Sequence, residues 1–242
     1  MKTASIIIIG NEILSGRTQD TNSNYLAKML VERGISLEEV RVIPDDHSII
    51  QSIVSNESST KDYVFTSGGI GPTHDDITAE AIANCFGVPL IVRDDAVKLL
   101  AMNYKNGEND LNAARLRMAR IPKGAKLIKN KISGAPGFII KNVFVMAGVP
   151  KIFEAMVKEV ILDLGSVNPI FSKTVKVLKR ESEISDKLWS YADKYKDISI
   201  GSYPFNSSGV FGVEIVLRHT DIGLLNKVFN EILKDFNEPN TS

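Results

Sequence analysis

Cysteine and histidine are scarce in this sequence, which has one cysteine and three histidines among 242 residues. The single cysteine, Cys85, cannot form an intramolecular disulfide. It follows Ala81, Ile82 and Ala83 in a pattern typical of the end of an amphipathic helix, so we expect a structural thiol rather than a reactive one. His74 has no second histidine or cysteine nearby, which argues against a His/Cys zinc site.

Net charge and long apolar runs are also missing. The 29 Lys and Arg residues balance 29 Asp and Glu residues, so no global field attracts nucleic acid or an anionic membrane. No apolar run approaches the ~20 residues that cross a bilayer, and the isoleucines of 6–9 form too short a core for a signal peptide. We therefore expect a cytoplasmic protein that binds neither nucleic acid nor membranes.

Strand and helix patterns alternate through the first two thirds of the chain. This order predicts a three-layer αβα domain with a parallel central sheet. Strands are expected at 6–9, 40–43, 63–66 and 88–92, and helices from Asp20–Ser23 through Leu30, from Asp46 or Ser48 through Val54, and from Asp75 or Asp76 through Ala83. Helices are then expected at 94–104, 111–120 and 151–164, with short strands at 125–128, 137–141 and 143–146.

Turn-forming residues at 165–169 predict a linker between two domains, 1–167 and 168–242. The second domain reads as a small α+β unit of βαββα order, similar to a KH arrangement. Its strands are expected at 171–178, 198–202 and 210–218, and its helices at 182–195 and 221–235. We expect Trp189, with Leu188 and Tyr191, on the core face of the first helix. RNA binding is not expected, because no Gly-x-x-Gly loop is flanked by basic residues.

The most informative stretch is 66–76, Thr-Ser-Gly-Gly-Ile-Gly-Pro-Thr-His-Asp-Asp. Glycines let backbone amides approach an anion, and the start of the following helix adds oriented donors, so this turn is suited to a phosphate. A tight structural turn is the alternative interpretation. No Gly-Lys-Ser/Thr follows, so the stretch is not a Walker A loop, and its spacing differs from the Rossmann fingerprint.

Acidic residues follow three of the predicted strands. One of Asp75 and Asp76 is expected to cap the next helix. A second carboxylate ~4 Å from a phosphate would repel it by about 4 kcal/mol, whereas Mg²⁺ bridges carboxylates to substrate phosphates. Glu12 and Asp45 lie at the same carboxyl edge of the sheet, where α/β proteins bind ligands. Alternatively, Glu12 is a surface acid, and Asp45 with Asp46 forms only a turn and a helix cap.

Six ordered motifs between about residues 10 and 150 together resemble the N-terminal MoaB/Mog-type domain of the CinA (competence/damage-inducible protein A) family. They are Gly10–Arg17 (Gly-Asn-Glu-Ile-Leu-Ser-Gly-Arg), Asp20–Ser23, Pro44–Asp46, Gly68–Thr78, Ala135–Phe138 and Gly148–Pro150. The same domain is similar to the N-terminal half of eukaryotic FAD synthases, and residues 198–204 resemble a segment found there.

The resemblance implies a molybdopterin-binding fold whose loops hold pterin or nucleotide phosphates, and assembly as a dimer or trimer. In the molybdenum-cofactor branch, the matched acids Asp45 and Asp76 are implicated in adenylylating molybdopterin. In the CinA branch the domain is associated with metal-dependent hydrolysis of ADP-ribose or FAD-like dinucleotides. The usual Pro-Gly-Val-Pro appears here as Ala147–Pro150, and no deamidase domain of full-length CinA is present, so deamidation is not expected.

These implications define a candidate site. Asp45, Asp75, Asp76 and Glu12 are the candidate catalytic residues, and Asp45 and Asp76 the candidate ligands of Mg²⁺, Mn²⁺ or Co²⁺. The candidate ligand-binding residues are Gly10, Asn11, Ser15, Gly16, Asn22, Thr66, Ser67, Gly68, Gly69, Gly71, Pro72, Thr73, Thr78, Pro136, Gly137, Gly148 and Pro150. Arg115, Arg117 and Arg120 recur at near-helical spacing, either as a cationic clamp for a phosphate or as a solvated basic face.

Three functions fit these residues. The first is a metal-dependent pyrophosphatase that acts on ADP-ribose or FAD-like dinucleotides. The second is a protein that binds or adenylylates molybdopterin in the same pocket. The third is a non-catalytic binding or regulatory module. In the first two cases the partner is a small molecule, a nucleotide or a pterin phosphate.

Overall fold

The computed structural model describes residues 2–165, 170–207 and 209–237. Contacts between Cα atoms divide the chain into two compact units, Met1–Val167 and Asn168–Ser242. Each unit has its own hydrophobic core, and each is described by itself. The predicted linker lies outside the described residues apart from Gly165.

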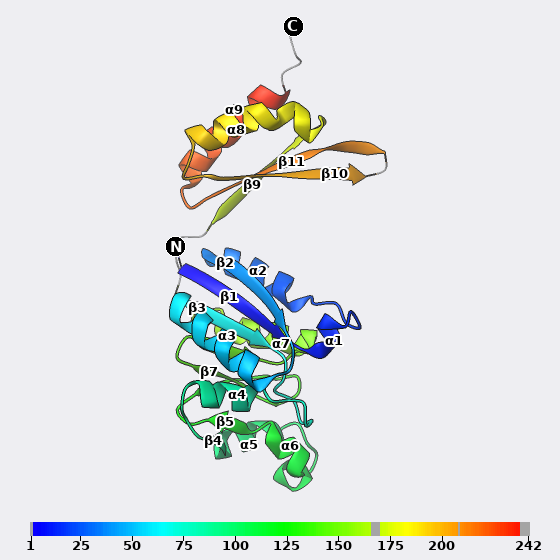
Figure 1. Ribbon diagram of the computed structural model, residues 1–242, viewed down its shortest axis with the longest axis vertical. Coiled ribbons are helices and arrows are strands. Elements are labelled where there is room, and N and C mark those ends of the chain that lie inside the picture. The colour runs from blue at the N-terminus through cyan, green and yellow to red at the C-terminus, as the bar shows by residue number, and fades with distance from the viewer. Residues whose placement is uncertain (1, 166–169, 208, 238–242) are drawn as a thin grey trace. The chain divides into compact units, whose positions relative to one another are not determined.

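A six-stranded sheet forms the centre of the first unit (Figure 1). Its strand order is β2-β1-β3-β8-β7-β6. The first four of these strands pair in parallel, and the pairs β8–β7 and β7–β6 are antiparallel. The prediction of a parallel sheet is therefore confirmed for most of its strands. Their bounds are β1 Lys2–Ile9, β2 Ile35–Ile43, β3 Tyr63–Ser67, β6 Lys126–Ile128, β7 Gly137–Ile140 and β8 Val143–Met146.

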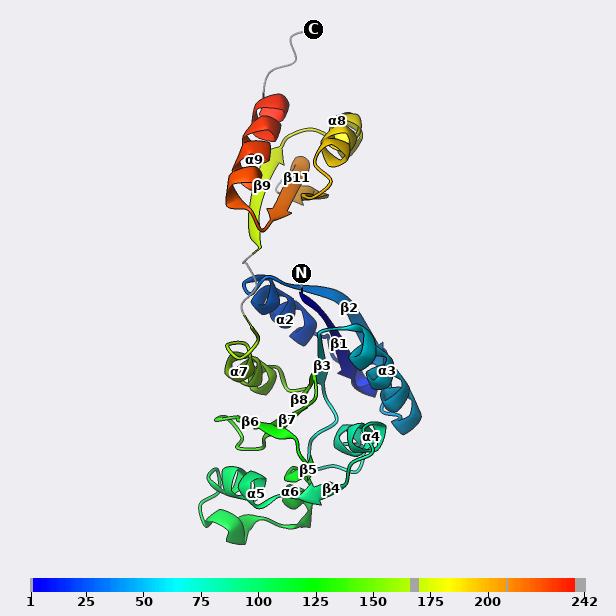
Figure 2. The same cartoon turned by 90° about the vertical axis from the view of Figure 1, so that its left-hand side faces the viewer.

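Helices cover both faces of this sheet, which gives the predicted three layers (Figure 2). The β-branched run of β1 divides between them, because alternate side chains of a strand point to opposite faces. Ile6 and Ile8 pack with the helices α2 (Asn22–Val31) and α7 (Pro150–Val160). Ile7 and Ile9 pack with α3 (His47–Thr60) and α4 (Thr78–Cys85). A short helix, α1 (Asn11–Leu14), follows β1 directly.

Residues 90–122 form a peripheral element that the sequence predicts only in part. The two expected helices are shorter, α5 (Asp94–Ala101) and α6 (Ala113–Arg117), and a 3₁₀ helix η1 (Gly107–Asp110) lies between them. A side-chain hydrogen bond takes the place of a helical backbone hydrogen bond between the two helices. In it, the Asp110 carboxylate accepts from the backbone N–H of Asn106. Residues Arg120–Pro122 form β5, which pairs with β4 (Leu90–Val92) instead of continuing the helix.

The second unit has the predicted order of strand, helix, strand, strand and helix. Its antiparallel sheet has the order β10-β11-β9. The elements are β9 Phe171–Val177, α8 Glu181–Lys194, β10 Ser199–Ser207, β11 Val210–His219 and α9 Ile222–Asn237. In the ranges that the structure describes, no helix is both long and apolar enough to cross a membrane.

The prediction for Trp189 was wrong. Its side chain is 75% exposed. Ile184 and Tyr191 of α8 are buried and Leu188 packs against the same core, so the core stripe follows the spacing i, i+4, i+7. Trp189 follows Leu188 by one position, about 100° further round the helix, and so points away from that stripe.

Candidate functional site

A cavity of about 530 Å³ lies at the carboxyl ends of the parallel strands. Its walls are the segments that follow β1, β2, β3 and β8, where ligands bind in open α/β sheets. The predicted residues in its lining are Glu12, Asp45, Gly68, Gly69, Gly71, Pro72, Asp75, Asp76, Gly148 and Pro150. Four of the six motifs recognised in the sequence thus contribute predicted residues to the lining of one cavity, two of them a single residue each.

The glycine-rich loop after β3 can be built only with glycine at two positions. Gly68 has φ +112°, and a Cβ there would lie 2.1 Å from the backbone oxygen of Ile9. Gly69 has φ +68°, and its Cβ would lie 2.1 Å from Thr78 Oγ1. Positive φ angles and such close approaches exclude other residues. The glycines therefore bring the loop against both β1 and the start of α4.

Three consecutive amides of this loop have no acceptor. The preceding amide, Gly68 N, donates to the Met146 carbonyl at 3.0 Å. The amides of Gly69, Ile70 and Gly71 donate to no group in the part of the chain that the structure describes. All three residues line the cavity. Successive unpaired N–H groups in such a turn make an anion-binding concavity.

Asp45 and Asp46 have different roles. Asp45 is half-buried, accepts a hydrogen bond from the Asn11 amide at 3.0 Å and lines the cavity. Asp46 is the N-cap of α3 and accepts from the amides of Ser48 and Ile49. The Ser48 hydroxyl, followed by the Ile49 amide, lowers the pKa of Asp46 below its ordinary value of 3.8. The interpretation as a helix cap therefore holds for Asp46, whereas Asp45 lies in the candidate site.

The expectation that Asp75 or Asp76 caps the next helix was wrong. Helix α4 begins at Thr78, and its N-cap residue is Ile77. The Asp76 carboxylate instead accepts from the backbone amide of Thr73 at 2.8 Å and from its hydroxyl. Because this bond closes the loop upon itself, the loop stays outside the helix and both carboxylates line the cavity.

A buried amide side chain connects the two glycine segments. Asn22 Nδ2, at the start of α2, donates to Ser67 Oγ at 2.9 Å and to the Gly148 carbonyl at 2.8 Å. A Cβ on Gly148 would lie 3.2 Å from Gly68 Cα. Asn22 and Ser67 also line a smaller cavity of about 50 Å³, together with Glu12. Asn22 therefore fixes the spacing of the loops after β3 and β8.

The remaining predicted residues are outside the lining of the large cavity. Thr66, Ser67, Thr78 and Gly137 are buried, and Pro136 lines a third small cavity. The others, which likewise do not line it, are Gly10, Asn11, Ser15, Gly16 and Thr73. Sequence reasoning missed Thr18, Met118 and Ser133, which do line it. They belong to none of the motifs, so the sequence carried no signal for them.

A metal ion at this site would have to be coordinated partly by the bound small molecule. In the described ranges, no group of three or more His, Cys, Asp or Glu side chains is placed to hold an ion. The carboxylates of Asp45, Asp75, Asp76 and Glu12 nevertheless face one cavity. Mg²⁺ is commonly held by one or two carboxylates plus substrate phosphates and water. The residues present fit that mode of binding and not an all-protein cage.

Family models match both units. Residues 5–166 match the model described as a probable molybdopterin binding domain. The chain therefore belongs to the molybdopterin-binding-domain family that includes CinA-like proteins. Residues 169–241 match the model of the FAD synthase middle domain, so the second unit is similar to that domain.

Individual relatives agree with this assignment. A protein of Archaeoglobus fulgidus is 39% identical over 199 residues, which cover 82% of this chain and 84% of that protein. A probable FAD synthase of Caenorhabditis elegans is 34% identical, and the match covers 90% of this chain but 46% of that protein. The crystal structure of the protein CinA from Thermoplasma acidophilum has 37% identity and a TM-score of 0.62, covering 67% of this chain and 97% of that one.

Proposed function

We propose that the chain is a metal-dependent pyrophosphatase that acts on ADP-ribose or FAD-like dinucleotides. The observation that carries this proposal is the juxtaposition, in one cavity, of three unpaired amides at Gly69–Gly71 with the carboxylates of Asp45, Asp75 and Asp76. Amides in this arrangement stabilise charge on phosphoryl oxygens, and carboxylates hold the cation that such oxygens need.

The reaction is the addition of water across a phosphoanhydride. The oxygen of water attacks one phosphorus, the bridging P–O bond breaks, and both products are phosphate monoesters, one of them AMP. A bound divalent cation would lower the charge on the phosphoryl oxygens and help to orient the water. The glycine loop would hold the attacked phosphoryl group, and Asp45 and Asp76 would hold the cation. Glu12, an exposed acid in the same lining, would orient the cation or the water.

The relatives support an adenine dinucleotide as the substrate. One of them is named a probable FAD synthase, and the match covers 46% of that protein, so its name supports a nucleotide-related ligand such as an FAD-like dinucleotide. The description of the matched family also supports a second candidate, the binding or adenylylation of molybdopterin in the same cavity. That ligand too would place its phosphate on the glycine loop.

The test is AMP release from ADP-ribose and from FAD by the purified chain with Mg²⁺, Mn²⁺ or Co²⁺. We expect turnover that EDTA abolishes and that Asp76→Ala reduces by about a hundredfold, because a bound cation contributes several kcal/mol to such reactions. Asp94→Ala is the matched control, since Asp94 is an exposed acid that does not line the cavity. Absence of AMP release from the folded protein would favour pterin binding or a regulatory role.

A further inference from the structure

The lining of the large cavity is negatively charged, so an anionic ligand there needs positive charge to balance it. Four carboxylates line it, and no lysine or arginine does so among the described residues. A diphosphate carries at least two negative charges, which these carboxylates repel. One divalent cation offsets only part of this negative charge, so a diphosphate ligand needs an additional cation close to the cavity.

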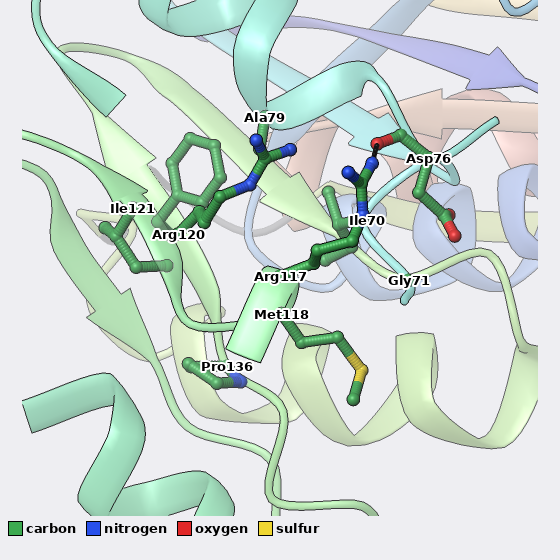
Figure 3. Close-up of a pocket in the computed structure, with 10 residues that line it drawn as sticks. Ile70, Gly71, Asp76, Ala79, Arg117, Met118, Arg120, Ile121 and Pro136 are labelled. Atoms are coloured by element: carbon green, nitrogen blue, oxygen red, sulfur yellow. Dashed lines mark hydrogen bonds between the residues drawn. The ribbon is translucent and has the colours of Figure 1, made fainter. Parts of the chain in front are cut away.

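Two arginines lie directly beside it. A small cavity shares Ile70, Gly71, Asp76 and Met118 with the large one, and adds the side chains of Arg117 and Arg120. Figure 3 shows the Arg120 guanidinium beside Ala79 and the Arg117 guanidinium beside the backbone of Asp76. The two cavities, the smaller of about 10 Å³, thus share a wall, which is the loop that carries the unpaired amides.

Arg117 lacks an anionic partner. Its Nη2 donates to the backbone oxygen of Asp76 at 3.4 Å, and within the described residues it takes part in no ion pair. Its Nε is buried without a hydrogen-bond acceptor. The carboxylate of Asp76 is bonded to Thr73 and points away from Arg117 (Figure 3). A partly buried guanidinium in these surroundings is unfavourable until an anion pairs with it.

The neighbouring arginines differ from Arg117 in instructive ways. Arg120 has a long ion pair, 3.9 Å from Glu80, and a buried Nε without an acceptor. Arg115 is on the same helix as Arg117 but stacks on Tyr104 at 4.3 Å and donates to the Asp110 carbonyl. Of the three arginines singled out in the sequence, only Arg117 and Arg120 line the small cavity beside the site. Arg117 is the one without an ion pair within the described ranges of the chain.

We propose that Arg117, assisted by Arg120, binds the second phosphoryl group of a diphosphate ligand whose first phosphoryl group lies on the glycine loop. This rests on the proposed function in one respect, that the ligand occupies the large cavity. It adds a specificity: the site selects diphosphate esters over monophosphates. A guanidinium is suited to this task because its planar donors engage a phosphate with two parallel hydrogen bonds.

Calorimetric titration with Mg²⁺ tests the proposal, using AMP and α,β-methylene-ADP, whose P–C–P bridge cannot be hydrolysed. The native chain should bind the diphosphate at least about tenfold more tightly than AMP. Arg117→Met should weaken the diphosphate by about 10- to 100-fold and change AMP by less than about threefold, as expected for one charge-assisted contact. Arg117→Lys should be intermediate, because lysine keeps the charge and loses the bidentate geometry.

Arg115→Met is the matched control and should keep the native preference. Equal weakening of both ligands in Arg117→Met would overturn the proposal, since it would mean that Arg117 only supports the Asp76 loop. An unchanged preference in that variant would overturn it as well. If the native chain binds neither nucleotide, the proposed function fails. The phosphate subsite at Arg117 is then tested separately by comparing the affinities for methylenediphosphonate and for inorganic phosphate. A diphosphonate preference lost in Arg117→Met supports the subsite, and no preference overturns it.

Discussion

At the scale of single residues, the adjacent acids Asp45 and Asp46 have different roles, one in the cavity and one in the stability of a helix. Asp46 supports α3 from outside the cavity lining, whereas Asp45 faces the cavity and is held by the Asn11 amide. A substitution at one position should therefore leave the property controlled by the other unchanged.

Asp46→Ala should lower the melting temperature without reducing ligand affinity, because it removes the cap of α3. The pKa of Asp46 is lowered in the folded state, so its stabilising effect is present above the ordinary value of 3.8 and is lost as the pH falls through the folded-state pKa. Thermal melts at pH 7 and near pH 2 check this. The difference between native and variant should be largest at pH 7, and a constant difference would contradict the assignment.

The roles of some of these acids could be predicted from the sequence, and the roles of others could not. It offered Asp46 as the helix cap, and the structure agrees, since a cap needs only local geometry. The same rule applied to Asp75 and Asp76 failed, because Thr73 competes for the Asp76 carboxylate. Whether Asp76 caps the helix or bonds to Thr73 depends on how the glycine loop packs against α4. The Thr78 amide at the start of α4 donates to the Gly69 carbonyl and fixes that packing.

At the scale of elements, Asn22 joins α2 to the loops after β3 and β8. Asn22→Ala should cost about 1–3 kcal/mol of unfolding free energy, because it leaves a buried hydroxyl and a carbonyl without a donor. It should also weaken ligand binding, since the loop at Gly148 loses its support. Chemical denaturation and calorimetric titration measure the two effects.

Asn142→Ala is a suitable comparison for that variant. Asn142 also bridges two segments, donating to the carbonyls of Ser58 and Lys61, but it does not line the cavity. Its loss should reduce stability alone. If both variants lost ligand affinity equally, the specific role of Asn22 would be refuted.

Elements with a strong pattern were predictable, and irregular ones were not. The isoleucine run of β1 and the amphipathic α7 follow from spacing alone. Residues 94–104 and 111–120 have helical spacing, yet the two helices end at Ala101 and Arg117, and Arg120 begins a strand. Pairing of β5 with β4 depends on residues about 30 positions away, which no local periodicity reveals.

At the scale of the whole molecule, every residue that lines the large cavity lies between Ile9 and Ile152. A fragment of residues 1–165 should therefore bind α,β-methylene-ADP with an affinity within about threefold of the full chain, because each unit has its own core. Titration of the folded fragment checks this. Loss of binding would mean that the second unit takes part in the site. The dimer or trimer suggested by the family resemblance stays a prediction.

The hydrogen bond between Asn22 and Gly148 joins residues that are 126 positions apart. A ribosome must therefore complete most of the first unit, and β8 must pair with β3, before this bond can close. Contacts of such sequence separation form late in folding. Ligand affinity should consequently appear after most of the secondary structure during refolding, and a ligand in the cell can stabilise the finished domain without guiding the earlier steps of its synthesis.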